Sequence, residues 1–167
     1  STPIPSRLVL LGDQSNDTQV ELAGLDARPS VNMPVSTEGV APGGRGIVLE
    51  RSFAEALGLR SGMTIELDSG DRSMRLEIVG TAVLPSQPRY PRQTPGLAWV
   101  DRTILEDLVP ATSTWRWSQA VRLHDPNAAD TFVDTVSTQF DPGEASFSTR
   151  DDQRAEALLD AQPIALA

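Results

Sequence analysis

Apolar and polar residues alternate along several short stretches of the chain, a pattern typical of strands that bury one face. Met63, Ile65 and Leu67 share one face of such a strand, with polar residues between them. A longer strand is predicted over residues 74–84. Its second face becomes apolar toward the end, which predicts burial on both faces there. Further strands are predicted over residues 7–12, 18–25, 47–49, 97–100, 115–123 and 145–148.

Helical spacing predicts one short helix in the first half of the chain and three helices after residue 100. Ser52 and Glu55 have the spacing of a capping box, and Gly58 suits the left-handed stop of the same helix. Asp101 is the expected cap of the next helix, which Pro110 ends. The remaining two helices are predicted over residues 126–140 and 151–160. A mostly antiparallel middle followed by strand, helix, strand and helix predicts an α+β fold.

The segment PSQPRYPRQTPG, residues 85–96, contains four prolines and is too proline-rich for a strand or helix through its middle. A connection of this length without secondary structure is often functional. Arg89, Tyr90 and Arg92 stand close together in it, and Arg and Tyr are favoured at binding hot spots. These three residues are the candidate partner-contact site, with an ordinary solvated connection as the alternative.

Charge and composition exclude several function classes. The net charge of the 167 residues is -9, and all 14 basic residues are Arg, so a nucleic-acid partner is not expected. The chain has no Cys and a single His, His124, which argues against thiolate chemistry and multi-histidine metal sites. Asp125 beside it has the position of a helix cap. We therefore expect no cofactor, no metal and no catalytic residues.

The longest apolar runs are much shorter than the roughly 20 residues of a membrane-spanning helix. The sequence begins with Ser and shows no signal-peptide pattern. We expect it to be a mature or excised part of a longer protein.

Residues 47–85, IVLERSFAEALGLRSGMTIELDSGDRSMRLEIVGTAVLP, resemble the extracytoplasmic domain of FtsX-like, MacB-type ABC transporter permeases. Residues 97–108 and 120–136 are similar to later segments of the same family. Met63 departs from the pattern, because the family usually has Asp there. The positions of residues 47–85 that match the family's pattern are Ser52, Ala54, Leu57, Gly58, Leu59, Gly62, Thr64–Leu67, Ile78, Val79 and Gly80.

The resemblance implies a porter-like α/β subdomain, from residues 1–46 and 101–167, and a small β-rich, sabre-like insert, residues 47–100. It also implies a place on the extracytoplasmic face of the bacterial cell membrane, with both ends running into transmembrane helices. The role would be non-catalytic: it would couple ATP-driven helix motion to substrate export or to an extracellular partner. The implied partners are a cytoplasmic ATPase subunit, a second permease copy, and an extracellular protein or exported substrate.

Two other interpretations stay open. One is a free-standing secreted ligand-binding module with an apolar site near Trp115 and Trp117, which predicts a closed cavity lined by those rings. The other is a hydrolase that uses Asp or Ser, which predicts that His124 meets distant acids in a cleft.

Overall fold

The computed structural model describes residues 3–12, 18–26, 31–41 and 44–160. Its contacts divide the chain into two compact units, Ser1–Ala120 and Val121–Ala167. Each unit is described by itself. In the described part of the chain, no helix is both long enough and apolar enough to cross a membrane.

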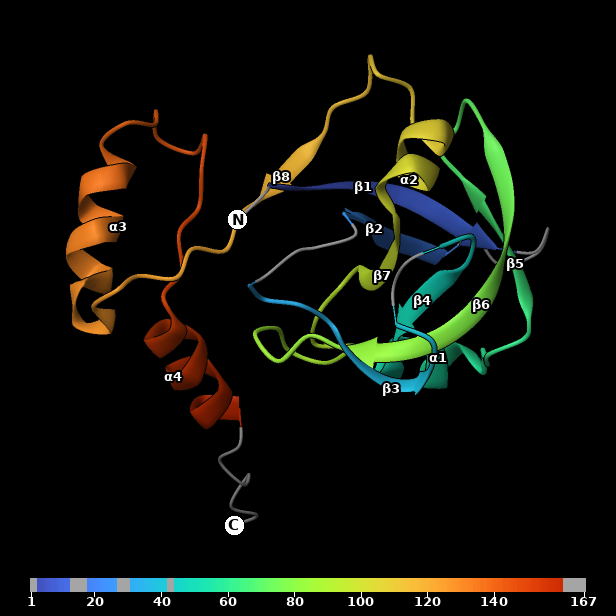
Figure 1. Ribbon diagram of the computed structural model, residues 1–167, viewed down its shortest axis with the longest axis horizontal. Coiled ribbons are helices and arrows are strands. Elements are labelled where there is room, and N and C mark those ends of the chain that lie inside the picture. The colour runs from blue at the N-terminus through green and yellow to red at the C-terminus, as the bar shows by residue number, and fades with distance from the viewer. Residues whose placement is uncertain (1–2, 13–17, 27–30, 42–43, 161–167) are drawn as a thin grey trace, which may run out of the picture. The chain divides into compact units, whose positions relative to one another are not determined.

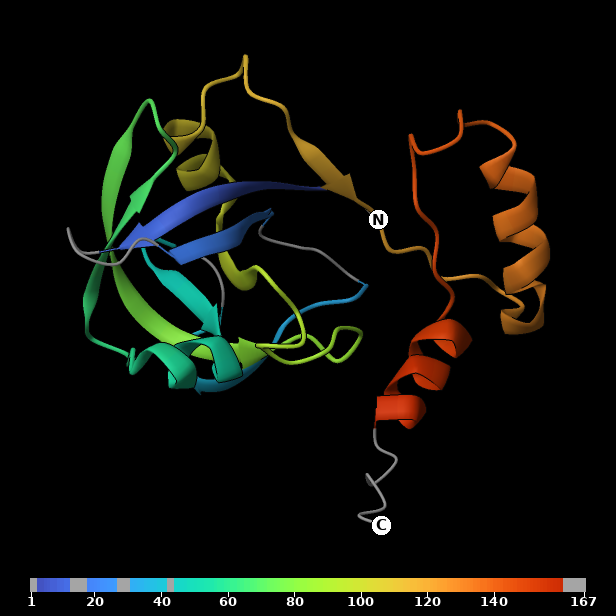
Figure 2. The same cartoon turned by 180° about the vertical axis from the view of Figure 1, so that it is seen from behind.

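Six strands of the first unit form a hydrogen-bonded ring (Figures 1 and 2). Around the ring the order is β1-β2-β7-β4-β6-β5, and β5 pairs with β1 to complete it. The β2–β7 and β4–β6 pairs are parallel, and the other four are antiparallel. A closed ring removes the free edges that an open sheet would expose. The ring strands are β1 (Ile4–Gly12), β2 (Thr18–Leu25), β4 (Ile47–Glu50), β5 (Thr64–Asp68), β6 (Ser73–Val83) and β7 (Gly96–Asp101).

Two short strands attach outside the ring. β3 (Val35–Gly39) pairs with the last part of β6, and β8 (Arg116–Ser118) pairs with the start of β1. Both are exposed along their whole length. β3 was not predicted, because its residues carry no apolar alternation.

Alternate residues of every ring strand fill the interior. The first core cluster takes side chains from all six strands, which only the inside of the ring can bring together. A second cluster contains residues of β2, β4 and β7 that alternate with the interior ones and point to the outer face of the ring. These three strands are therefore buried on both faces. Thr81 and Ala82 are buried as well, which confirms the two-sided burial predicted for the end of β6. The interior residues are Val9, Leu11, Val20, Leu22, Ile47, Leu49, Ile65, Leu67, Leu76, Ile78, Ala98 and Val100.

Helix α1 (Arg51–Leu57) follows β4 directly and packs Phe53 and Ala54 into the interior cluster. Gly58 ends the helix in the left-handed conformation, with φ 68°, as predicted. The predicted capping box is wrong. The N-cap is Glu50, whose carboxylate accepts the amide hydrogen of Phe53, and Ser52 lies inside the helix. The reason is that the strand runs straight into the helix, which places the cap on the last strand residue.

Helix α2 (Arg102–Leu108) packs Leu105 and Leu108 against the interior cluster. Its predicted cap is confirmed. Asp101 accepts hydrogen bonds from the hydroxyl and the amide of Thr103, at 2.7 and 3.0 Å. Both bonds lower the pKa of Asp101 from its ordinary value of 3.8, and the bond from the hydroxyl has the larger effect.

We expect Asp101→Ala to lower the free energy of unfolding by about 1 kcal/mol at neutral pH, the usual cost of losing an N-cap. The pKa of Asp101 is lower in the folded chain than in the unfolded chain. The stability that its carboxylate contributes is therefore complete at a pH above the unfolded pKa of 3.8, and it is lost as the pH falls through the lower pKa of the folded chain. Urea denaturation of the wild type and of Asp101→Ala, at several pH values from neutral to acidic, measures this loss. A difference in free energy of unfolding between the two proteins that stays constant with pH would contradict the role of the Asp101 carboxylate as a cap.

The contacts divide the chain after Ala120, and the porter-like and sabre-like division expected from the resemblance stays a prediction. β1 and β2 come from residues 1–46, yet they pair with β5 and β7 from residues 47–100. The two sequence segments therefore share one ring and one core. A mixed fold dominated by its sheet, with few helices, agrees with the predicted α+β class.

The second unit contains a 3₁₀ turn η1 (Pro126–Ala128) and the helices α3 (Ala129–Ser137) and α4 (Arg150–Asp160). Asp125 caps the turn by accepting the amide hydrogen of Asn127 at 2.9 Å. None of its residues between 121 and 155 is buried, and Phe132 is 38% exposed. The predicted strand over 145–148 is wrong, because that segment finds no strand to pair with among the described residues.

Candidate functional site

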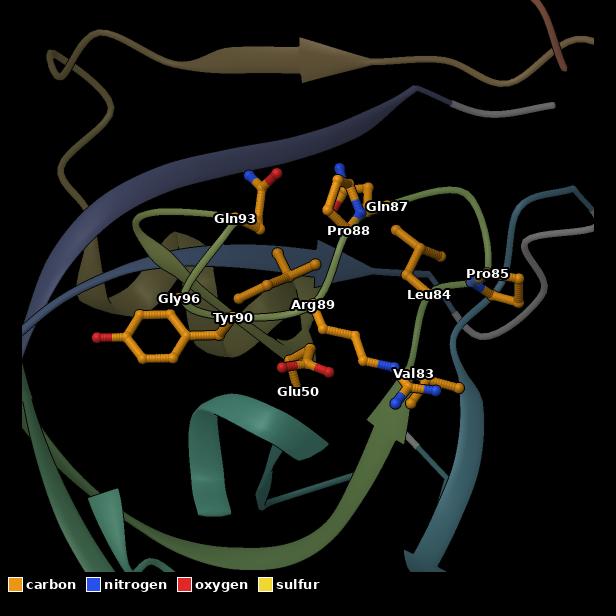
Figure 3. A pocket seen from close by; sticks show the side chains of 11 residues that line it. Glu50, Val83, Leu84, Pro85, Gln87, Pro88, Arg89, Tyr90, Gln93 and Gly96 are labelled. Atoms are coloured by element: carbon orange, nitrogen blue, oxygen red, sulfur yellow. The ribbon is translucent and has the colours of Figure 1, made fainter. Parts of the chain in front are cut away.

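The proline-rich loop between β6 and β7 covers a cavity of about 310 Å³ (Figure 3). The floor is the junction of β4 with α1, and the walls come from the loop and the strand ends beside it. The volume is at the lower end of the range for small-molecule pockets. The lining residues are Glu50, Val83, Leu84, Pro85, Gln87, Pro88, Arg89, Tyr90, Gln93, Gly96 and Leu97.

Glu50 is the acidic residue of this lining. It is only 6% exposed, because it ends a strand whose other residues are fully buried. Its Oε2 accepts the amide hydrogen of Phe53 at 2.9 Å and the hydroxyl hydrogen of Ser52 at 2.6 Å. A buried carboxylate is costly without such donors. The two bonds therefore hold the carboxylate in one orientation on the cavity wall.

Tyr90 fastens the loop to the core. Its ring meets Phe53 edge to face, with ring centroids 5.2 Å apart and an interplanar angle of 74°. Gly96, the last residue of the loop, lies so close that a Cβ there would be 2.2 Å from Phe53 Cδ2. Phe53 itself is fully buried. The shape of the cavity therefore depends on one core ring that touches the middle of the loop and its last residue.

The structure separates the three sequence-predicted residues of the loop. Arg89 and Tyr90 both line the cavity, whereas Arg92 is exposed and outside the lining. Arg89 extends along the cavity toward Val83 (Figure 3). Tyr90 is half-buried and packs against the core cluster, and contact of the three residues with a partner stays a prediction.

Sequence reasoning missed Glu50, Gln87 and Gln93. The available signal was the acid at the end of IVLE, a strand otherwise composed of apolar residues. An acid that closes a buried strand and opens a helix is a candidate for a cap with a buried charge.

The lining has the chemistry of a binding site. It offers one carboxylate, one guanidinium and two side-chain amides, among apolar, aromatic and proline side chains. The lining contains no Ser, Thr, Cys or His side chain. These groups can form hydrogen bonds and ion pairs with a small ligand.

The tryptophan site expected for a free-standing ligand-binding module differs from both of the hollows described for the two units. The ring centroids of Trp115 and Trp117 are 6.4 Å apart. Trp117 is 60% exposed, and of the two rings only Trp115 packs against the core. The predicted strand over 115–123 is reduced to β8, because only three of its residues pair with β1. Neither the cavity above nor the hollow of the second unit is lined by these rings.

His124 lies in an open hollow of the second unit, on the surface of α3. Asp125 is the acid in that lining, and its carboxylate already accepts two hydrogen bonds from Asn127. The convergence of His124 with distant acids, expected for a hydrolase, is not seen among these lining residues. Over the described part of the chain, no three His, Cys, Asp or Glu side chains gather closely enough to hold a metal ion.

No protein-family model matches the sequence, and no curated protein matches it. Among solved structures, the chain is similar to the crystal structure of the extracellular domain of the noncanonic ABC-type transporter YknZ from Gram-positive bacteria. The two chains are 15% identical, with a TM-score of 0.47, and the alignment covers 81% of this chain and 76% of the other.

Proposed function

We propose that this chain is the extracytoplasmic, non-catalytic domain of an FtsX-like, MacB-type ABC transporter permease. The observation that carries the proposal is the ordered motif of residues 47–80, in which several matching positions have a defined structural task. Gly58 and Gly62 have φ values of 68° and 87°, and Gly80 lies against the backbone next to β3. A side chain at any of these positions would be strained or would overlap its neighbours.

The function follows from rigidity. One cluster of buried side chains fills the interior of the six-strand ring, and in the proposed role such a close-packed interior lets the ring transmit a displacement with little deformation. In the proposed role, ATP hydrolysis in a cytoplasmic subunit moves transmembrane helices of the parent protein, and the domain moves as a body on the outer side of the membrane. That motion would drive substrate export or act on an extracellular partner, and a second permease copy would complete the assembly.

The proposal is tested by sequencing the gene on both sides of this segment. We expect hydrophobic stretches of about 20 residues on each flank, with a gene for an ATPase beside it. A stop codon directly after Ala167, together with a cleavable signal peptide before Ser1, would overturn the proposal and indicate a secreted domain.

A further inference from the structure

We propose that the cavity beneath the 85–96 loop binds a small ligand through an ammonium group, which the carboxylate of Glu50 holds. Arg89 would take a carboxylate or carbonyl oxygen of the same ligand. The chemistry is that of a free amino acid or of the amino-terminal end of a short peptide. This inference is independent of the transporter proposal, because it concerns binding by the first unit alone.

The position of Glu50 argues for a cationic group. The residue is only 6% exposed, yet it forms part of the cavity wall. Both hydrogen bonds that its carboxylate accepts from described residues end on Oε2. The described residues give Oε1 no such bond, and because Oε1 is not one of the buried side-chain atoms left without a partner, it remains accessible from the cavity. A carboxylate is purely an acceptor, with room for about four bonds, so a donor with positive charge complements it.

Arg89 does not neutralise Glu50. No ion pair within 4.0 Å joins the two side chains, and the described residues provide Arg89 with no side-chain hydrogen bond. Figure 3 shows its guanidinium beside Val83, on the wall of the same cavity. The fork of a guanidinium fits a carboxylate in bidentate fashion. The cavity therefore presents one fixed negative group and one positive group that can reach into it.

The rest of the lining suits the short body of such a ligand. The amides of Gln87 and Gln93 can donate to or accept from a peptide group. Leu84 and Leu97 offer apolar contact beside them. The alternative is that Glu50 serves only as the cap of α1, and the experiment separates the two roles.

The probe is L-alanyl-L-alanyl-L-alanine, titrated into the 167-residue chain while backbone amide chemical shifts and binding heat are measured. We expect saturable shifts at Gln93 and Gly96, and at least a tenfold loss of affinity when the tripeptide is N-acetylated. L-Alanine, titrated in the same way, distinguishes the two sources: tighter binding of the tripeptide indicates a peptide end, and comparable binding indicates an amino acid.

The decisive variant is Glu50→Gln, because glutamine keeps an oxygen that can cap Phe53 and removes only the charge. We expect at least a tenfold loss of affinity for the tripeptide with little change in melting temperature. Arg89→Ala should weaken binding of the tripeptide more than binding of its C-terminal amide. Arg60→Ala is the control, an exposed arginine of the first unit outside the lining, and should bind like the wild type.

The proposal is overturned if N-acetylated and free tripeptide bind equally, or if folded Glu50→Gln keeps its affinity. It is also overturned if the amide chemical shifts of Gln93 and Gly96 stay unchanged when the tripeptide, and separately alanine, is added up to its solubility limit. The comparison of acetylated with free peptide uses the wild-type chain, so it stands even if the variant fails to fold.

Discussion

Phe53→Ala is expected to lower the free energy of unfolding by about 3–5 kcal/mol, the usual cost of removing a buried aromatic ring. Phe53 is fully buried in the interior cluster and contacts the proline-rich loop at Tyr90, in its middle, and at Gly96, its last residue. Its removal therefore leaves a cavity in the core and releases the support of the loop. Because a domain is stable by only about 5–15 kcal/mol, the loss is a large part of the total.

Urea denaturation followed by circular dichroism measures this effect, and Leu57→Ala is the matched control. Leu57 belongs to the same helix but is 37% exposed, so its truncation should cost much less. Amide shifts of Gln93 should also change in Phe53→Ala and not in the control, because the ring of Phe53 packs against Tyr90 and Gly96 of the loop. Equal destabilisation by the two substitutions would show that Phe53 does not hold the core as described.

Gly80→Ala is expected to destabilise the domain by about 1–3 kcal/mol or more, as an overpacked site that cannot relax easily. A Cβ on Gly80 would lie 2.4 Å from the carbonyl oxygen of Glu38 and 2.8 Å from that of Val40. Both obstacles are backbone atoms of β3 and the residue after it. The substitution must therefore push β3 away from β6 or distort β6 itself.

Hydrogen exchange locates that damage. The amide of Val40 donates to the carbonyl oxygen of Val79 at 3.0 Å, and we expect this amide to lose protection in Gly80→Ala. Gly70→Ala is the comparison. Gly70 has φ 92°, but a Cβ on it would meet no described atom within 4 Å, so only backbone strain is added. If Val40 stays protected in Gly80→Ala, the close approach of β3 is not what requires the glycine.

The sequence by itself determined the parts of this protein that depend on neighbours along the chain. The left-handed stop at Gly58, the cap at Asp101 and the faces of β5 and β6 all follow from local geometry and from periodicity. The ordered motif of residues 47–80 carried the family resemblance for the same reason. The loop of residues 85–96 was also identified as a candidate site from its proline, arginine and tyrosine content.

Only the tertiary structure decided how these parts meet. The ring closes through the parallel β2–β7 and β4–β6 pairs, whose partners are distant in sequence, and no local pattern encodes such pairing. The same long-range packing turned Tyr90 inward onto Phe53 and left Trp117 exposed. It also brought Glu50 under a loop that begins only at Pro85. An alternating pattern shows that a face is buried, but the neighbour that buries it is set by the topology of the whole chain.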